Sequence, residues 1–331
     1  MMKATEINEC LKGKLLQQGN ELNIEKFLFD SRKISHPTTS IFVPIVSERR
    51  NAHKFIQEVY DAGVRFFLIS EEIDLTLLAE AWVVKVDDTL KAVQKLAAFY
   101  RAKFAIPIIG ITGSNGKTVI KEWLYHLLEN DYKLVRSPKS FNSQIGVPIS
   151  VWLLRPDTQM AIFEAGISQA GEMENLEKII KPSIGIFSNI GESHNEGFLN
   201  IRHKINEKLL LFKNCDTLIY NKDYHELHDC ILQFAMHLKN NLNKEIKLLE
   251  WSKKSEADLQ IIQIEKKNHH SHIKAIFQAS EISLTIPFID DASIENCIHC
   301  WLTLLHLQVP QHEMDSRFEK LLPIAMRLEL I

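Results

Sequence analysis

The stretch that decides the fold is Pro107-Ile108-Ile109-Gly110-Ile111-Thr112-Gly113-Ser114-Asn115-Gly116-Lys117-Thr118. Its apolar first half predicts a buried strand, and the amphipathic pattern that begins at Lys117 predicts a helix to about Asn130. Between them stand two glycines, which can turn backbone N–H groups toward an anion without a clash at Cβ. A strand, a glycine-rich loop and a helix N-terminus in this order predict a phosphate-binding loop.

The loop departs from the most common spacing of such motifs. The pattern G-x-x-x-x-G-K-[ST] requires glycine where Ile111 stands, and the loop instead reads T-G-x-x-G-K-T. We expect Lys117 to contact the β- and γ-phosphates of ATP and the Thr118 hydroxyl to ligate Mg²⁺. The expected nucleotide contacts in the loop are Gly113, Ser114, Asn115, Gly116, Lys117 and Thr118. A glycine-rich turn without a ligand is the alternative, but the strand, the glycines, the Lys-Thr pair and the helix all favour the nucleotide site.

Composition and charge narrow the class of protein. A chain of 331 residues is long enough for two domains, and 45% hydrophobic with 24% charged residues is typical of globular proteins. A net charge of −3 without a basic run gives no indication of a nucleic-acid partner. The sequence contains neither an apolar stretch near the ~20 residues of a membrane span nor the apolar core of a signal peptide at its N-terminus.

The cysteines indicate a reducing environment. There are five, scattered along the chain, so we expect free thiols and a cytoplasmic location. Cys297-Ile298-His299-Cys300 has the spacing of metal ligands, but it lies in a helical pattern without a second ligand pair. We therefore interpret this segment as helix packing.

Alternating patterns along the chain predict an α/β protein with two domains. Residues 1–104 read as a small α/β domain, and residues 105–325 as a P-loop-type central domain with a mostly parallel sheet. Short alternating runs over residues 245–288 predict an antiparallel appendage on that sheet. Residues 326–331 end within an apolar run, which we interpret as the start of a linker to a further domain.

Several other polar residues lie where ligands bind in such folds, and the residues alone leave their roles open. Asp30-Ser31-Arg32 follows a strand predicted over residues 24–29; a surface turn is favoured, and an arginine contact to phosphate or carboxylate is the alternative. Glu164 ends an apolar strand, where it is either a Mg²⁺ ligand or a carboxylate that faces water. His194 follows another parallel strand, where ligands collect, although a lone histidine there is more often structural. Lys208 lies in a predicted helix over residues 201–212 and is one helix lysine among several along the chain.

Six motifs stand in a defined order along the chain. After the T-G-x-x-G-K-T loop, Asn142 to Pro148 fits N-x-x-x-G-V-P, and Glu164-Ala165-Gly166 with Gly171-Glu172 fits E-x-G…G-E. Further on, Asn189-Ile190-Gly191, His194 and Glu196-Gly197-Phe198 fit N-I-G-x-x-H-x-E-x-F. Before the loop stand Asp30-Ser31-Arg32 and Asn51-Ala52-His53-Lys54-Phe55-Ile56, which look like a uridine-nucleotide domain. In this combination the motifs resemble the Mur ligase family.

The resemblance implies an ATP-dependent amide ligase of peptidoglycan-precursor synthesis. The E-x-G…G-E stretch is typical of the branch that adds D-alanyl-D-alanine to UDP-MurNAc-tripeptide through an acyl phosphate. The implied cofactors are ATP and Mg²⁺. The implied metal ligands are Thr118, Glu164, His194 and Lys208, the last after carbamylation of its amine, which turns a cation into an oxygen donor.

The resemblance also assigns roles to individual residues. Lys117, Lys208 and His194 are the expected catalytic residues. Asn296 and Arg327 are expected near the nucleotide. The expected contacts of the UDP-substrate are Ser31, Arg32, Asn142 and Ser143, the first two in a UDP-binding N-terminal domain.

The chain departs from the family pattern in places. Ala292 and Ser293 stand where the family often has His-Asn, and Leu210 stands where it often has glutamate, so the adenine contacts and the surroundings of Lys208 differ from the pattern. The family's third, C-terminal domain is missing from this sequence, and we expect the chain to bind substrates without ligating them. Two less common segments, Phe141-Asn142-Ser143 and Asp290-Asp291-Ala292-Ser293, favour the subfamily in which such a ligase is fused to an alanine racemase.

Two rival functions stay open on sequence grounds. One is another amide ligase of the same superfamily, of the folylpolyglutamate or cyanophycin synthetase type, although a uridine-binding domain would then have no purpose. The other is a P-loop NTPase that serves as a switch or binding module and hydrolyses ATP without an acceptor amine. Binding of a folate in place of UDP-MurNAc-peptide would favour the first rival. ATP hydrolysis that does not depend on Lys208 would favour the second.

Overall fold

The computed structural model describes residues 1–47, 50–191 and 197–324, which form two compact units. Unit 1 comprises residues 1–105 and 144–156, and unit 2 comprises residues 106–143 and the chain from residue 157 onward. The chain thus first passes from unit 1 to unit 2 one residue beyond the predicted boundary.

Residues 144–156, which we predicted as part of the second domain, belong instead to unit 1. They contain helix α5 (Gly146–Val151) and Trp152. The Trp152 ring packs on the rings of Phe27 and Tyr100, with centroids 4.4 and 4.7 Å apart. Burial of this large apolar side chain in the core of unit 1 explains why the segment packs there.

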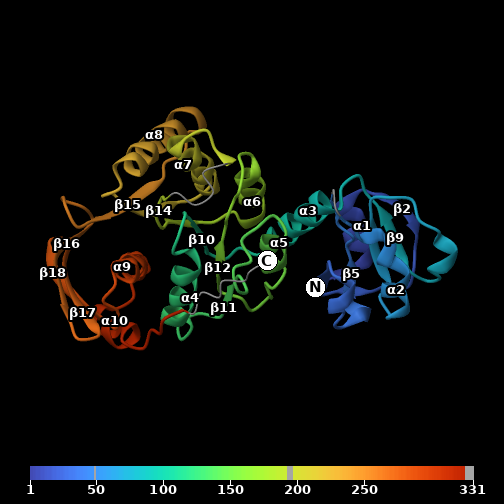
Figure 1. Cartoon of the computed structure of the whole chain (residues 1–331), viewed down its shortest axis with the longest axis horizontal. Helices are drawn as coiled ribbons and strands as arrows, with labels where there is room; N and C mark the ends of the chain where they lie inside the picture. The colour runs from blue at the N-terminus through green and yellow to red at the C-terminus, as the bar shows by residue number, and fades with distance from the viewer. Residues whose placement is uncertain (48–49, 192–196, 325–331) are drawn as a thin grey trace. The chain divides into compact units, whose positions relative to one another are not determined.

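Unit 1 is built around a five-stranded sheet in the order β2-β9-β8-β5-β4 (Figure 1). Only β2 runs antiparallel to its neighbour; the other pairs are parallel. The strands are β2 (Lys14–Gln17), β4 (Lys26–Leu28), β5 (Ser40–Phe42), β8 (Phe66–Ile69) and β9 (Trp82–Lys85). Short pairs join β1 (Met2–Lys3) to β3 (Asn23–Ile24) and β6 (Val46–Ser47) to β7 (Arg50–Asn51). The α-helices are α1 (Ala4–Leu11), α2 (Ile56–Asp61), α3 (Thr89–Arg101) and α5.

Local details of unit 1 differ from the sequence pattern in three places. The strand predicted over residues 24–29 is interrupted, because Ile24 pairs with Met2 while Lys26–Leu28 pairs with β5. Strand β2 was not predicted, since its four residues carry little alternation. The polar segment that carries the N-x-x-x-G-V-P motif becomes helical at Gly146, where Pro148 in the first turn is tolerated because its missing N–H has no partner to lose there.

Unit 2 contains a nine-stranded sheet in the order β11-β12-β10-β13-β14-β15-β16-β17-β18 (Figure 1). Its strands are β10 (Ile108–Thr112), β11 (Leu134–Arg136), β12 (Met160–Glu164), β13 (Ile184–Phe187), β14 (Thr217–Asn221), β15 (Lys247–Ser252), β16 (Leu259–Lys267), β17 (His270–Phe277) and β18 (Ser280–Ile286). The predicted strand before the loop, β10, is buried along its whole length between β12 and β13. The loop that follows it therefore lies at the centre of the parallel part of the sheet.

The antiparallel appendage is confirmed for β16, β17 and β18 but not for β15. Strand β15 runs parallel to β14, and the first residues of β16 pair in parallel with the end of β15. Only the pairs β16–β17 and β17–β18 are antiparallel. A run of alternating residues has the same appearance in either orientation, so the pattern did not distinguish them.

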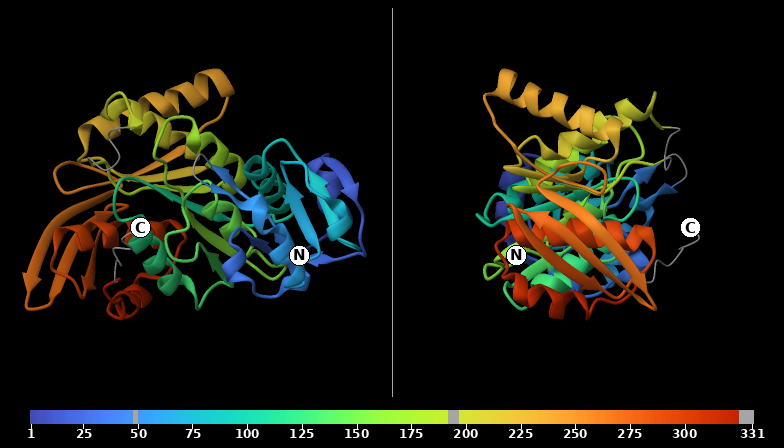
Figure 2. Two further views of the ribbon diagram at one scale, coloured as in Figure 1. Left: turned by 45° about the vertical axis from the view of Figure 1, so that its right-hand side comes forward. Right: turned by 90° about the vertical axis from the view of Figure 1, so that its left-hand side faces the viewer.

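Helices cover both faces of this sheet (Figure 2). On one face lie α4 (Lys117–Leu128), α9 (Asp291–His306) and α10 (Gln311–Phe318). On the other lie α6 (Glu172–Ile180), α7 (Ile201–Leu209), the 3₁₀ turn η6 (Leu210–Phe212) and α8 (His225–Leu242). One hydrophobic core joins α4 and α9 to strands β16, β17 and β18, with Trp123, Trp301 and Leu284 among its buried members. None of the helices in the described ranges has both the length and the apolar composition to span a bilayer.

Candidate functional site

The loop between β10 and α4 has the backbone of a phosphate-binding loop. Gly113 and Gly116 have φ angles of 144° and 81°, which disfavour any residue with a side chain. Space is also lacking, because a Cβ on Gly113 would lie 2.1 Å from Ser188 Oγ, and one on Gly116 would lie 2.3 Å from Asn296 Oδ1. The two glycines in the motif are therefore required by both conformation and packing.

A second loop, after β13, holds the phosphate-binding loop in place. The Ser114 and Asn115 N–H groups donate to the backbone oxygen and Oδ1 of Asn189, each at 2.9 Å. The Gly191 N–H donates to Ser114 Oγ at 2.9 Å. Ser114 and Asn115 thus use their own N–H groups to shape the loop.

Three other N–H groups of the loop are available to bind an anion. The N–H groups of Gly116, Lys117 and Thr118, at the start of α4, have no acceptor among the described residues. The N-terminus of a helix attracts anions through these unpaired donors and through the helix dipole. The loop is therefore ready to bind phosphate oxygens at its helical end.

The predicted metal ligands Thr118 and Glu164 meet beside the loop. The Thr118 hydroxyl donates to Glu164 Oε2 at 2.9 Å and lies 3.2 Å from the hydroxyl of Ser140. Glu164, at the end of β12, is completely buried. Hydroxyl and carboxylate oxygens are hard ligands of the kind Mg²⁺ prefers, and Mg²⁺ keeps several waters, so this donor set fits the ion.

Three lysines converge on backbone carbonyls of the two loops. Lys117 Nζ donates to Gly113 O at 2.9 Å, and Lys208 Nζ donates to the same oxygen at 3.2 Å. Lys204 Nζ donates to Gly191 O at 2.6 Å. Burial, and then the charges of Lys117 and Lys204, lower the pKa of Lys208 to about 7. Burial likewise lowers the pKa of Lys117. The site thus brings several positive charges together, and a bound anion would reduce the repulsion between them.

Sequence reasoning missed two buried lysines of this site. Lys121 is completely buried, with its Nζ 3.3 Å from Glu164 Oε1, and Lys204 is 1% exposed. The spacing in the sequence could have indicated them. Lys121 lies one helical turn after Lys117, and Lys204 lies one turn before Lys208, so each pair shares a helix face. The same spacing is ordinary for solvent-exposed lysines on a helix, so it did not show that these two are buried.

The remaining predicted residues of unit 2 lie in different surroundings. The Asn296 side chain lies against Gly116. Asn142 accepts a hydrogen bond from the Gly166 N–H at 2.9 Å, which ties two of the sequence motifs together, and Ser143 is the next residue along the chain. His194 and Arg327 lie outside the described residues.

The predicted substrate residues of unit 1 stand at the start of the 3₁₀ turn η1 (Ser31–Lys33). Ser31 is buried, whereas the Arg32 side chain is 79% exposed. The guanidinium of Arg32 donates to both carboxylate oxygens of Asp30 at 2.8 Å. This contact holds the pKa of Asp30 well below its usual range. Both readings of the segment, surface turn and anion contact, are compatible with this geometry.

The Cys297–Cys300 segment packs inside α9. Cys297, His299 and Cys300 are completely buried. His299 contacts Ser188 O and Trp251, as a packing residue does. In the ranges that the structure describes, no group of three or more His, Cys, Asp or Glu side chains is arranged to hold a metal ion. The interpretation of this segment as helix packing is confirmed.

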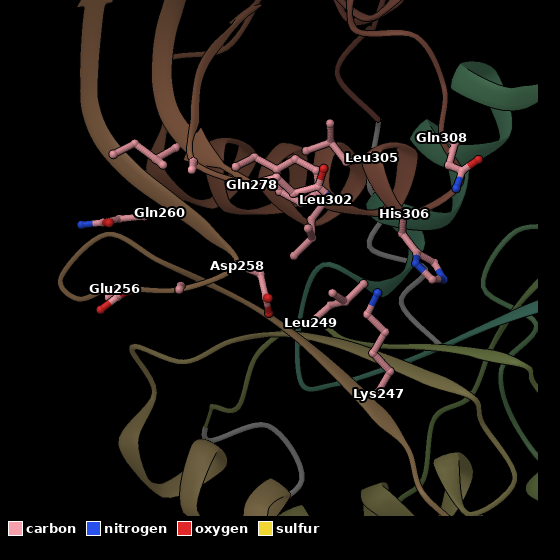
Figure 3. Close-up of a pocket in the computed structure, with 14 residues that line it drawn as sticks. Lys247, Leu249, Glu256, Asp258, Gln260, Gln278, Leu302, Leu305, His306 and Gln308 are labelled. Atoms are coloured by element: carbon pink, nitrogen blue, oxygen red, sulfur yellow. The ribbon is translucent and has the colours of Figure 1, made fainter.

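A separate hollow of about 690 Å³ lies in unit 2 between β15 and α9 (Figure 3). Lys247, at the start of β15, and His306, at the end of α9, point toward one another there. The phosphate-binding loop follows the end of β10, and parallel strands start and end at opposite edges of a sheet, so the hollow is distinct from that site. None of the residues predicted for a site lines it.

The fold and the site define a P-loop α/β protein with a hydroxyl–carboxylate pair beside its loop. Over residues 111–304, more than half of its length, the chain matches the family model described as Mur ligase middle domain. The chain therefore belongs to the Mur ligase family.

Individual relatives support this assignment. The chain is 29% identical over 338 residues to the UDP-N-acetylmuramoyl-tripeptide–D-alanyl-D-alanine ligase of Bacillus subtilis, covering 100% of this chain and 70% of the relative. It is 35% identical over 188 residues to the ligase of the same name from Treponema pallidum, covering 54% of this chain and 40% of the relative.

Solved structures support the fold. A MurF from Acinetobacter baumannii matches with a TM-score of 0.83 at 22% identity, covering 99% of this chain and 70% of that one. The MurF ligase of Thermotoga maritima in complex with ADP matches with a TM-score of 0.75 at 19% identity, covering 91% of this chain and 66% of that one. The α/β architecture predicted from the sequence, with a small first domain before the P-loop domain, is confirmed.

Proposed function

We propose that this chain carries the UDP-substrate site and the ATP site of a ligase that joins D-alanyl-D-alanine to UDP-MurNAc-tripeptide. The observation that carries the proposal is the meeting of the Thr118 hydroxyl and the Glu164 carboxylate, 2.9 Å apart, beside the phosphate-binding loop. It occurs in a chain that is similar along its whole length to a Bacillus subtilis ligase of that name. The chain spans 70% of the length of that relative. For these residues we therefore propose binding and orientation of the substrates.

In this proposal unit 2 binds ATP. The N–H groups of Gly116, Lys117 and Thr118 donate to phosphate oxygens, aided by the field of α4. The Lys117 ammonium moves from the Gly113 carbonyl to the γ-phosphate and spreads the charge that develops during transfer. Asn296, which lies against Gly116, contacts the nucleotide beyond the loop.

Thr118 and Glu164 would hold one Mg²⁺, and carbamylated Lys208 with His194 would hold a second. When bound, Mg²⁺ neutralises charge on the phosphates. The first pair is supported by its oxygen donors and by their 2.9 Å separation. Lys208 is supported by its position 3.2 Å from Gly113 O.

The reaction forms the new amide in two steps. The carboxylate of the tripeptide attacks the γ-phosphorus of ATP, giving an acyl phosphate and ADP. The amine of D-alanyl-D-alanine then attacks the acyl carbon, loses a proton and releases phosphate. The first step brings two anions together, whose repulsion at ~4 Å is about 4 kcal/mol at an effective dielectric constant of 20. The cations of Lys117 and Lys204 oppose this repulsion.

Lys208 is the residue that we expect to be carbamylated. Its buried amine has a pKa of about 7 and so is partly neutral near neutral pH. The neutral nitrogen attacks CO₂, the N–C bond forms, and loss of a proton leaves a carbamate anion whose oxygens suit Mg²⁺.

Carbon NMR tests the carbamate directly. With ¹³C-bicarbonate, the protein should show one slow-exchanging carbamate signal that Lys208→Met lacks and that Lys213→Met, a change to an exposed lysine nearby, retains. A signal that persists in Lys208→Met, or no signal in the unaltered protein, would contradict the assignment.

Unit 1 would bind the uridine diphosphate end of the substrate. Two of the five N–H groups of the Arg32 guanidinium engage Asp30, which fixes its orientation and leaves others for a phosphate. Arginine suits such contacts because its planar fork matches two phosphate oxygens. Ser31, buried at the start of η1, supplies a hydroxyl beside it.

Calorimetric titration with UDP-MurNAc-tripeptide, with and without a non-hydrolysable ATP analogue and Mg²⁺, tests the proposed function. We expect Lys117→Ala to abolish nucleotide binding and to leave binding of the UDP-substrate unchanged. Arg32→Ala should weaken binding of the UDP-substrate by about 10- to 100-fold, as for the loss of a charged hydrogen bond, and leave the nucleotide unaffected.

The control for Arg32 is Lys33→Ala, which removes a neighbouring charge from the same turn. Nucleotide binding without any response to the UDP-substrate would refute the proposal and favour another amide ligase of the superfamily. Binding of a folate in place of the UDP-substrate would identify the folylpolyglutamate type.

A further inference from the structure

We propose that Lys121 is a positioning residue that holds the Glu164 carboxylate in place for a divalent cation. This inference rests on the proposed function, because it concerns the same nucleotide site. Lys121 lies one helical turn after Lys117 on α4, and its side chain is completely buried. A buried lysine is costly unless its charge is compensated, so the partners that compensate it indicate its role.

The ammonium of Lys121 fixes one oxygen of the metal-binding carboxylate. Its Nζ lies 3.3 Å from Glu164 Oε1, and both side chains are fully excluded from solvent. The other oxygen, Glu164 Oε2, accepts the hydrogen bond from Thr118 Oγ1 at 2.9 Å. Since each oxygen has its own partner, the carboxylate cannot rotate without breaking one of these contacts. Oε2 therefore stays beside the Thr118 hydroxyl.

The same ammonium fixes the turn that faces the site. Lys121 Nζ donates to the backbone oxygen of Ser137 at 2.8 Å and to that of Lys139. The two carbonyls belong to the turn that leads to Ser140, whose hydroxyl lies 3.2 Å from Thr118 Oγ1. Lys121 thus anchors two of the three oxygen-bearing side chains that meet beside the loop.

Glu122 provides a matched control on the same ammonium. Its Oε1 lies 3.0 Å from Lys121 Nζ, and its Oε2 lies 2.8 Å from Arg136 Nε. The Arg136 guanidinium in turn lies over the Tyr125 ring, 3.4 Å from its centroid. This side of the network involves no group of the nucleotide site, so Glu122→Gln removes one charged partner of Lys121 and leaves its contacts with Glu164 and the turn at residues 137–140 in place.

The test is a double-mutant cycle on Mg²⁺-dependent binding of a non-hydrolysable ATP analogue, measured by calorimetry. Lys121→Met should weaken the Mg²⁺-dependent part of binding by about 10- to 100-fold, as expected when a group that orients a metal ligand is lost. In a Glu164→Gln background the same change should have little further effect, because Lys121 acts through that carboxylate. Binding in EDTA should not change, and Glu122→Gln should keep the Mg²⁺ dependence of the unaltered protein.

Binding of Mn²⁺ in the presence of the analogue, followed by electron paramagnetic resonance, provides a readout that a purely structural lysine would not alter. If Lys121→Met does not fold, Lys121→Gln serves instead, since its amide can still donate to the Ser137 and Lys139 carbonyls. An equal loss in both backgrounds, an unchanged Mg²⁺ dependence or tighter Mg²⁺ binding would each overturn the inference. Failure of the unaltered protein to bind Mg²⁺-nucleotide at all would overturn the proposed function, and the inference with it.

Discussion

At the scale of single residues, buried polar groups in unit 2 are held in one protonation state by their partners. His299 is an example, because its Nε2 donates to Ser188 O at 2.8 Å and its Nδ1 accepts from Trp251 Nε1 at 3.3 Å. Both contacts require a neutral imidazole, since a second proton on Nδ1 would face the indole N–H. Burial lowers the pKa of His299 to about 4.

This arrangement predicts an acid-sensitive contribution to stability. The unfolded chain binds a proton at His299 below about pH 6.5, whereas the folded chain does so only below about pH 4. Stability therefore falls as the pH drops from about 6.5 to 4, by a total on the order of 3 kcal/mol from this residue, and the loss levels off below that window.

Urea unfolding as a function of pH measures the effect. His299→Gln, which keeps a donor for Ser188 O, should reduce the dependence of the unfolding free energy on pH within that window, whatever its effect on stability at neutral pH. An unchanged pH dependence would mean that His299 is already protonated in the folded protein.

At the scale of elements, the β17–β18 hairpin carries local strain. Its two turn residues, Gln278 and Ala279, have φ angles of 49° and 62°. Two-residue hairpin turns with both φ angles positive match the twist of the strands and favour Asn-Gly. Here the strands are long and well paired, from Phe277 with Ser280 to Ser271 with Ile286, and this pairing imposes the conformation on unfavourable residues.

Ala279→Gly should therefore stabilise the protein. Glycine removes the ~1–2 kcal/mol that the left-handed conformation costs a residue with a Cβ. Its greater freedom in the unfolded chain lowers this gain in stability by ~0.5–1 kcal/mol. We expect a net gain of about 0.5–1 kcal/mol in the free energy of unfolding, measured with urea.

Ala275→Gly is the control, since Ala275 is buried in extended conformation in β17. That change should destabilise the protein. A loss of stability in both variants would show that the turn is not strained.

At the scale of the whole molecule, the two proposed binding functions belong to separate units. The phosphate-binding loop lies in unit 2, and Arg32 lies in unit 1. The chain crosses between the units near residues 105, 143 and 156. Changes at Lys117 and Arg32 are for this reason expected to act on different ligands.

Much of the fold follows from local sequence information. The strand, glycine loop and helix around Gly113 and Gly116 were predictable because all of their determinants lie within about ten residues of one another. The antiparallel hairpin over β17 and β18 was predictable because only a short polar turn separates two alternating runs, too short for a parallel crossover. Strand orientation for β15 and membership of residues 144–156 in unit 1 were not, because both depend on partners far away in the chain.

The sequence by itself therefore determined the α/β class, the phosphate-binding loop and, through its motifs, the resemblance to the Mur ligases. Only the tertiary structure decided which polar side chains share the site. Glu164 reaches Thr118 because the sheet order places β12 beside β10. Lys121 and Lys204 differ from other helix lysines only in what the fold packs around them. Burial and charge pairing are properties of the folded arrangement, and no local pattern of residues specifies them.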